Sequence, residues 1–183
     1  MTVGYKEWSL VCEALGAGVQ TVLLRKGGIA EGGDGFAFSH PRFHLLPTLF
    51  HQQEEQVRWS PLQEEVRGDD GSWLIRYEAE VVATAVLTDW EKVRALQPFH
   101  IWNESVVKER FEYQGRYLIH AALVRIRKRE QIMRVAETSG MRGCRSWVDY
   151  SLEDDAFTEK SSPVLSDEEF EGRQNRVEGL WKN

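Results

Sequence analysis

The spacing of apolar residues along the chain predicts a mixture of strands and short helices. The clearest signal is an alternation over residues 73–87, where Trp73, Ile75 and Tyr77 begin one face of a strand. A second alternation predicts another long strand over residues 117–129. Shorter apolar runs predict strands at residues 19–25, 36–39, 43–46 and 144–150.

Helices are predicted where apolar residues recur every three or four positions or where a capping residue precedes them. Such spacing predicts helices over residues 5–15 and 90–96, the second capped by Asp89, and Pro47-Thr48 opens another over 49–57. A capping pattern from Ser166 to Glu169 predicts a helix near the end of the chain. The whole pattern predicts a single α+β domain with a mainly antiparallel or barrel-like sheet and short flanking helices.

Composition and charge divide the chain into a body and a tail. The 183 residues are 42% hydrophobic, which is enough for one folded domain over residues 1–149. Residues 150–183 carry nine acidic and four basic side chains, and we expect this tail to be mobile or docked. With no long apolar run, no secretory leader and two distant cysteines, we expect a cytoplasmic protein without a membrane partner.

A glycine-rich stretch beside two basic residues is the first candidate binding site. Five glycines fall within residues 26–35, and their backbone amides could hold an anion next to the cation of Lys26. No Gly-Lys-Ser/Thr follows, so the stretch is not a P-loop. The substrate-binding residues expected in this part of the chain are Arg25, Gly27, Gly28, Thr48 and Gln52.

Histidines and carboxylates near this stretch suggest catalytic roles. His51 is the candidate acid–base, Lys26 would stabilise developing charge, and Glu31 completes the catalytic set. A divalent metal, whose presence and identity stay open, could be bound by His44, His51 and Glu31. The alternative is that these histidines are structural.

A basic stretch forms the second candidate site. Residues 106–149 hold ten basic and five acidic side chains, and Arg125, Arg127 and Arg129 share one face of the predicted strand. Guanidinium groups fit phosphates and aromatic rings stack on bases, so these arginines and Trp147 could contact nucleic acid. The alternative is a solvated strand edge. We expect Glu78 and Glu80 to lie on a solvated strand face as well; the alternative is that these paired carboxylates hold a divalent metal or do acid–base work.

Two strings, RKGGIAE at residues 25–31 and LLPTLFHQ at 45–52, resemble a bacterial family known only as a domain of unknown function. The resemblance extends over the body to about Tyr150 and not over the tail. It implies no established activity. It does imply a shared site, which would contain Arg25, Lys26, Glu31, Thr48, His51 and Gln52.

These features favour a protein that binds a phosphate-containing ligand, with RNA or DNA as the expected partner. If it is an enzyme, it is a hydrolase, either a phosphodiester-cleaving nuclease or a small-molecule or nucleotide hydrolase with a His/carboxylate metal site. A further alternative is a non-enzymatic interaction module whose acidic tail binds a protein partner.

Overall fold

A seven-stranded, mostly antiparallel sheet organises the computed structural model, which describes residues 2–26, 36–49, 53–59, 64–143, 145–150 and 160–182. The strand order is β2-β5-β4-β3-β1-β6, and β7 pairs with β5 beside this path. The strands are β1 (Thr2–Trp8), β2 (Val22–Arg25), β3 (Arg42–Thr48), β4 (Trp73–Leu87), β5 (Ile119–Val135), β6 (Trp147–Tyr150) and β7 (Ser161–Pro163). The only parallel pair among the described strands is β1 with β3.

The predicted α+β class is confirmed, and the sheet is open rather than barrel-shaped. In the described part of the chain β2 and β6 lie at opposite ends of the strand order and do not pair with each other. The helices are α1 (Ser9–Gly16), α2 (Trp90–Ala95), α3 (Glu104–Glu112) and α4 (Asp167–Lys182). Among the described residues, no helix has the length and apolar character needed to cross a membrane.

The long alternating strand and the two capped helices are confirmed. β4 covers residues 73–87 as predicted, the Asp89 side chain accepts a hydrogen bond from the amide of Glu91, and the Ser166 hydroxyl lies 2.7 Å from Glu169 Oε2. The helix predicted over residues 5–15 is wrong in its first part. Residues 5–8 continue β1, which pairs with β3 and β6, and α1 begins only at Ser9.

Two apolar clusters lie against the sheet. In β3, Leu45 belongs to the larger cluster and its neighbour Leu46 to the smaller one. Neighbouring residues of a strand point to opposite faces, so the two clusters lie on opposite faces of β3. Tyr5 of β1 belongs to the larger cluster, so Lys6 points to the other face. The two faces of β1 therefore offer two different surroundings for a ligand.

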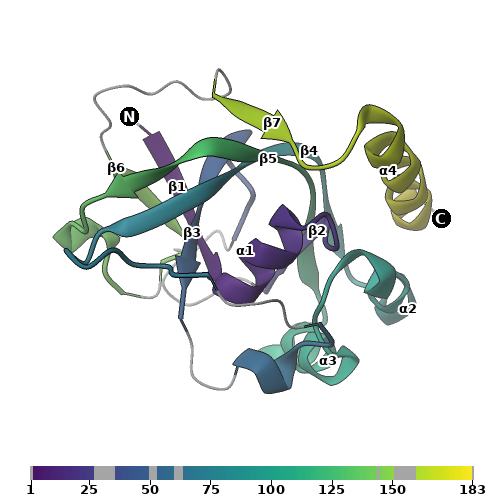
Figure 1. Cartoon of the computed structure of the whole chain (residues 1–183). Coiled ribbons are helices and arrows are strands. Elements are labelled where there is room, and N and C mark those ends of the chain that lie inside the picture. Colours follow the sequence, from purple (N-terminus) through teal and green to yellow (C-terminus); the bar gives the residue numbers. More distant parts are fainter. Residues whose placement is uncertain are drawn as a thin grey trace.

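The C-terminal segment lies against the body of the protein. Phe170 and Val177 of α4 are 3% and 0% exposed and belong to the larger apolar cluster. Figure 1 shows α4 (yellow) following β7 and lying near α2 at one side of the sheet. Within residues 160–182, the predicted tail is thus a strand and a helix packed on the same core as β5.

Candidate functional site

Arg25 and Trp147, both predicted ligand-binding residues, each lie beside the buried ring of Tyr5. The guanidinium carbon of Arg25 lies 5.4 Å from the centroid of the Tyr5 ring. The Trp147 ring lies 4.8 Å from the same ring. β2 contributes the arginine and β6 the tryptophan, so the sheet assembles this pair from residues 122 positions apart in sequence.

Two more aromatic side chains extend this surface. The His40 ring lies 4.8 Å from the Trp147 ring, and the Phe38 ring lies 6.0 Å from the Tyr5 ring. Phe38, His40 and Trp147 are half-buried, so each keeps part of its ring accessible. We call Arg25, Phe38, His40 and Trp147 the Arg25–Trp147 surface. It combines one guanidinium with rings that can stack on a flat ligand.

Arg25 is held in place by contacts with Ser146 and Glu7. Its Nε and Nη2 atoms donate hydrogen bonds to the Ser146 hydroxyl at 3.2 and 2.9 Å. The Glu7 carboxylate, whose side chain is 2% exposed, lies 3.9 Å from Arg25 Nη1. The Arg25 side chain is 26% exposed, so its outer edge stays accessible for an anion.

A second guanidinium raises the positive charge on this side of β1. Arg110 of α3 lies over the Trp102 ring at 3.8 Å and near the Trp8 ring at 5.5 Å. Burial, with a smaller contribution from the charge of Arg25, lowers the pKa of Arg110, while the Glu7 carboxylate opposes the shift. Two arginines therefore lie near the buried carboxylate of Glu7.

Lys26 has a structural role that differs from the one predicted. Its ammonium group donates hydrogen bonds to the carbonyl oxygens of Phe111 at 2.8 Å, of Leu118 at 3.0 Å and of Arg116. These contacts use all of its N–H donors and fasten the end of β2 to the region after α3. Burial and the charge of Arg116 lower its pKa.

The other predicted residues of this region are partly outside the described part of the chain. Thr48 donates a hydrogen bond from its hydroxyl to the carbonyl of Glu7 at 3.0 Å, which joins the ends of β1 and β3. Gly27, Gly28, Glu31, His51 and Gln52 lie outside the described residues.

His44, a candidate metal ligand, belongs to a buried polar network. It is 1% exposed, its Nδ1 lies 2.6 Å from the Tyr150 hydroxyl, and its Nε2 lies 3.7 Å from Glu78 Oε1. Within the described residues, no cluster of three His, Cys, Asp or Glu side chains could hold a metal ion.

Glu78 corrects the expectation of a solvated strand face. It is 1% exposed and accepts hydrogen bonds from Ser161 at 3.0 Å and from Arg129. Burial raises the pKa of Glu78, but the nearby His44, the hydrogen bond from Ser161 and the charge of Arg129 outweigh it, so the net shift is downward. Glu80, in contrast, is 43% exposed beside Arg42. The C-terminal segment, which supplies Ser161, covers Glu78 and not Glu80.

The predicted phosphate-binding arginines of β5 are engaged by the chain itself. Arg125 pairs with Asp167 at the start of α4. Arg127 donates to the Ser161 hydroxyl at 3.0 Å and to the Ser161 carbonyl. Arg129 pairs with Glu78. The structure therefore places Arg25 and Trp147 beside the same Tyr5 ring, and places Arg125, Arg127 and Arg129 against Asp167, Ser161 and Glu78.

Comparison with known proteins adds the family. A family model described as "Domain of unknown function (DUF1802)" matches residues 4–176. The chain belongs to this family. The match confirms the resemblance noted in the sequence and extends it beyond Tyr150 into the C-terminal segment.

Comparisons of this DUF1802 protein with curated proteins and with solved structures identify no near relative among the matches described below. No curated protein matches the chain. A solved structure of a mutant ASCH protein from Zymomonas mobilis resembles it with a TM-score of 0.46 and 14% sequence identity, over 95% of this chain and 94% of that one.

Proposed function

We propose that this protein binds a phosphate-containing ligand, and specifically single-stranded RNA or DNA, at the Arg25–Trp147 surface. The observation that carries the proposal is that Arg25 and Trp147 both lie beside the Tyr5 ring, at 5.4 and 4.8 Å from its centroid. A guanidinium group beside accessible aromatic rings suits a phosphate followed by an unpaired base.

Each group has a distinct task in this proposal. Phosphate oxygens accept hydrogen bonds from the exposed edge of Arg25, whose opposite edge is fixed by Ser146. Bases stack on the accessible parts of Trp147 and His40, whose rings already contact each other at 4.8 Å. Stacking on an aromatic side chain requires an unpaired base, so single strands should bind more tightly than duplexes.

The proposal is limited to binding. The hydrolytic alternatives depend on His51 and Glu31, which lie outside the described residues. The predicted role of Lys26 in stabilising charge would require it to leave the three carbonyl groups that it contacts.

Fluorescence anisotropy of a labelled single-stranded RNA or DNA tests the proposal with the full chain. We expect Arg25→Gln to weaken binding by about tenfold, a free-energy loss of about 1.4 kcal/mol, because one charge-assisted contact is removed. The dependence of affinity on salt should become weaker, by about 0.7 in the logarithmic slope for one lost contact to a single strand.

Arg94→Gln is the matched control, because Arg94 is an exposed arginine of α2 that pairs with Glu91. It should leave the affinity unchanged. The proposal is wrong if the wild-type protein shows no salt-sensitive binding to single strands, or if Arg25→Gln and Arg94→Gln bind equally well.

A further inference from the structure

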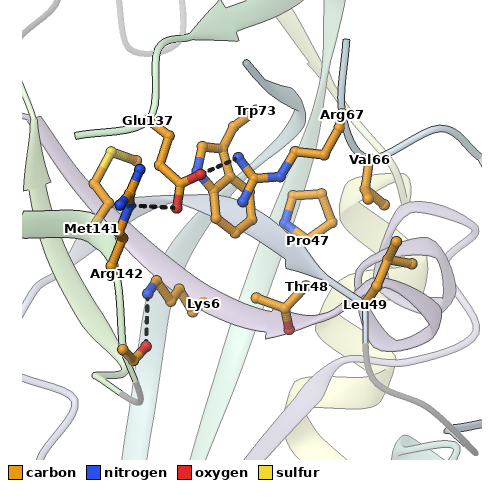
Figure 2. Close-up of a pocket in the computed structure, with 11 residues that line it drawn as sticks. Lys6, Pro47, Thr48, Leu49, Val66, Arg67, Trp73, Glu137, Met141 and Arg142 are labelled. Atoms are coloured by element: carbon orange, nitrogen blue, oxygen red, sulfur yellow. Dashed lines mark hydrogen bonds and ion pairs between the residues drawn. The ribbon is translucent and has the colours of Figure 1, made fainter. Parts of the chain in front are cut away.

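A cavity opens on the face of β1 that lies opposite the Arg25–Trp147 surface. Its volume is about 380 Å³, and it is bordered by Lys6 of β1 and by Thr48 at the end of β3 (Figure 2). Because Tyr5 and Lys6 are neighbours in β1, their side chains point to opposite faces of the sheet. The cavity is therefore a separate place from the surface proposed above.

One side of the cavity carries positive charge. Lys6, Arg67 and Arg142 line it, and Glu137 is the one carboxylate among its described lining residues. The Glu137 carboxylate pairs with two arginines: its Oε2 lies 3.4 Å from Arg67 Nη1, and its Oε1 lies 3.9 Å from Arg142 Nε. Lys6 donates a hydrogen bond to the carbonyl of Gly143 at 3.0 Å. The described lining residues therefore include three cations and one carboxylate, a set of charges that suits an anion.

The other side of the cavity is apolar. Figure 2 shows Pro47, Leu49 and Val66 across the hollow from Arg142 and Lys6. Leu49 is 65% exposed, an unusually open position for a large aliphatic side chain. A ligand with an anionic end and a flat or apolar body would contact both sides at once.

The back of the cavity holds an unused hydrogen-bond donor. Trp73 is 3% exposed, and its buried indole N–H has no hydrogen-bond partner among the described residues. The guanidinium of Arg67 lies flat over the same ring, with its carbon 3.5 Å from the centroid. Buried N–H groups are nearly always paired in folded proteins, so this donor is an exception among the described residues that line the cavity.

We propose that this cavity binds a phosphomonoester that carries a flat ring, which is the chemistry of a mononucleotide. The phosphate lies between Lys6 and Arg142, and the ring lies against Pro47, Leu49 and Val66. A volume of about 380 Å³ is within the range of roughly 300–1,000 Å³ typical of small-molecule sites, and it suits one nucleotide. Such a nucleotide is either a free molecule or the phosphorylated end of a strand.

Isothermal titration of the full chain with 5′-mononucleotides, the matching nucleosides and inorganic phosphate tests this inference. The nucleotide should bind more tightly than either the nucleoside or phosphate, because only the nucleotide fills both sides of the cavity. Arg142→Gln should weaken nucleotide binding by about tenfold, the loss expected for one charge-assisted contact. The Arg142 side chain is 75% exposed, so the substitution should leave folding intact.

Arg134→Gln is the control, since Arg134 is a 62% exposed arginine of β5 that pairs with Asp70 and does not line the cavity. The inference is overturned if nucleoside or phosphate binds as tightly as the nucleotide, or if both arginine variants lose the same affinity. Lys6→Gln gives a second, independent reading and should also weaken nucleotide binding.

Strands with and without a 5′-phosphate distinguish the two sources of the ligand. A strand end is indicated if the 5′-phosphate strengthens binding and this gain disappears in Arg142→Gln. A free nucleotide is indicated if mononucleotides bind and the 5′-phosphate gives no gain. Because Arg25→Gln leaves the cavity unchanged, loss of strand binding in that variant with normal mononucleotide binding separates the two proposals.

Discussion

The arginines of β5 and Arg25 carry the same chemical group in very different surroundings. Arg125, Arg127 and Arg129 are each engaged by Asp167, Ser161 or Glu78. Arg25 is anchored by Ser146, with the Glu7 carboxylate 3.9 Å away, and its outer edge remains accessible beside aromatic rings. A basic stretch in a sequence therefore indicates a binding surface only where the fold places its charges beside groups that can share in binding, as the aromatic rings beside Arg25 can.

The difference arises from the C-terminal segment, which is distant in sequence. β7 pairs with β5 from Arg127 to Arg129, and α4 begins beside Arg125. This segment engages Arg125 and Arg127, and Glu78 of β4 engages Arg129. Arg25, in contrast, lies against the ring of Tyr5 as well as Ser146 and Glu7. We refer to these two regions as the covered side and the open side.

The sharpest test of the covered side is removal of its buried carboxylate. Glu78→Ala leaves Arg129, 12% exposed in its side chain, without its ionic partner. Breaking a buried ion pair in this way costs about 3–5 kcal/mol, and we expect the free energy of unfolding in urea to fall by that amount. The network also loses its link to Ser161.

Glu80→Ala is the control on the same strand. Glu80 is 43% exposed and lies 3.5 Å from Arg42, itself 50% exposed, so the loss should be about 0–1 kcal/mol. Equal losses in the two variants would mean that Arg129 finds solvent or another acceptor. The pKa of Glu78 is lower in the folded chain than in the unfolded chain. The stabilisation that ionised Glu78 provides is therefore complete above its unfolded pKa, and it is lost as the pH falls through its folded pKa.

A buried histidine, His100, should make the protein respond to acid at higher pH than Glu78 does. Burial, together with the charges of Arg58 and Arg110, lowers the pKa of His100 to about 3 from an ordinary value of 6.5. Below about pH 6.5, His100 therefore binds a proton in the unfolded chain but stays neutral in the folded chain. The unfolding free energy should fall by up to about 1.4 kcal/mol per pH unit, or roughly 3 kcal/mol by pH 4.

Urea unfolding between neutral pH and pH 4 measures this effect. His100→Phe removes the titrating group, so the pH dependence in this range should become flatter than in the wild type. Identical slopes for the two proteins would show that His100 does not govern the acid response. A wild-type loss that begins only below about pH 4.5 would instead assign it to carboxylates such as Glu78.

The sequence predicts local features well because they depend on neighbouring residues. The alternation over residues 73–87 and the capping pattern at Ser166 and Glu169 are set within a few positions, and both are confirmed. Residues 5–8 were predicted as helix because Trp8 shares helical spacing with Val11 and Leu15. They form a strand because β3 and β6 pair with them, and that pairing is non-local.

The candidate sites follow the same rule. The sequence singles out Arg25 and Trp147 separately, but only the fold shows that they share the Tyr5 ring. The cavity was missed because Lys6, Arg67 and Arg142 come from three distant parts of the chain, none with a recognisable motif. The burial of Glu78 was missed because its alternation matches a solvated face, while its cover comes from Ser161.

Arg127 of the covered side and Arg25 of the open side should differ in role, since Arg127 contributes to stability and Arg25 to binding. Arg127→Gln should lower the unfolding free energy by about 1–3 kcal/mol, since a charged donor to Ser161 is lost. It should leave the affinity for single strands unchanged, in contrast to Arg25→Gln. A loss of affinity in Arg127→Gln, measured by anisotropy under conditions where the variant is fully folded, would place nucleic acid on the covered side.

The weakest expected effect concerns the contact at the outer edge of the covered side. Asp167 is 80% exposed and Arg125 is 28% exposed, so Asp167→Asn should change the unfolding free energy by about 0–1 kcal/mol. Its effect on strand affinity should be equally small, because the other two arginines keep their partners. If Asp167→Asn instead strengthens binding severalfold, the carboxylate occupies the place of a phosphate. The covered side would then be a binding surface that the acidic segment blocks, and the distinction between the two sides would lie in regulation rather than in structure.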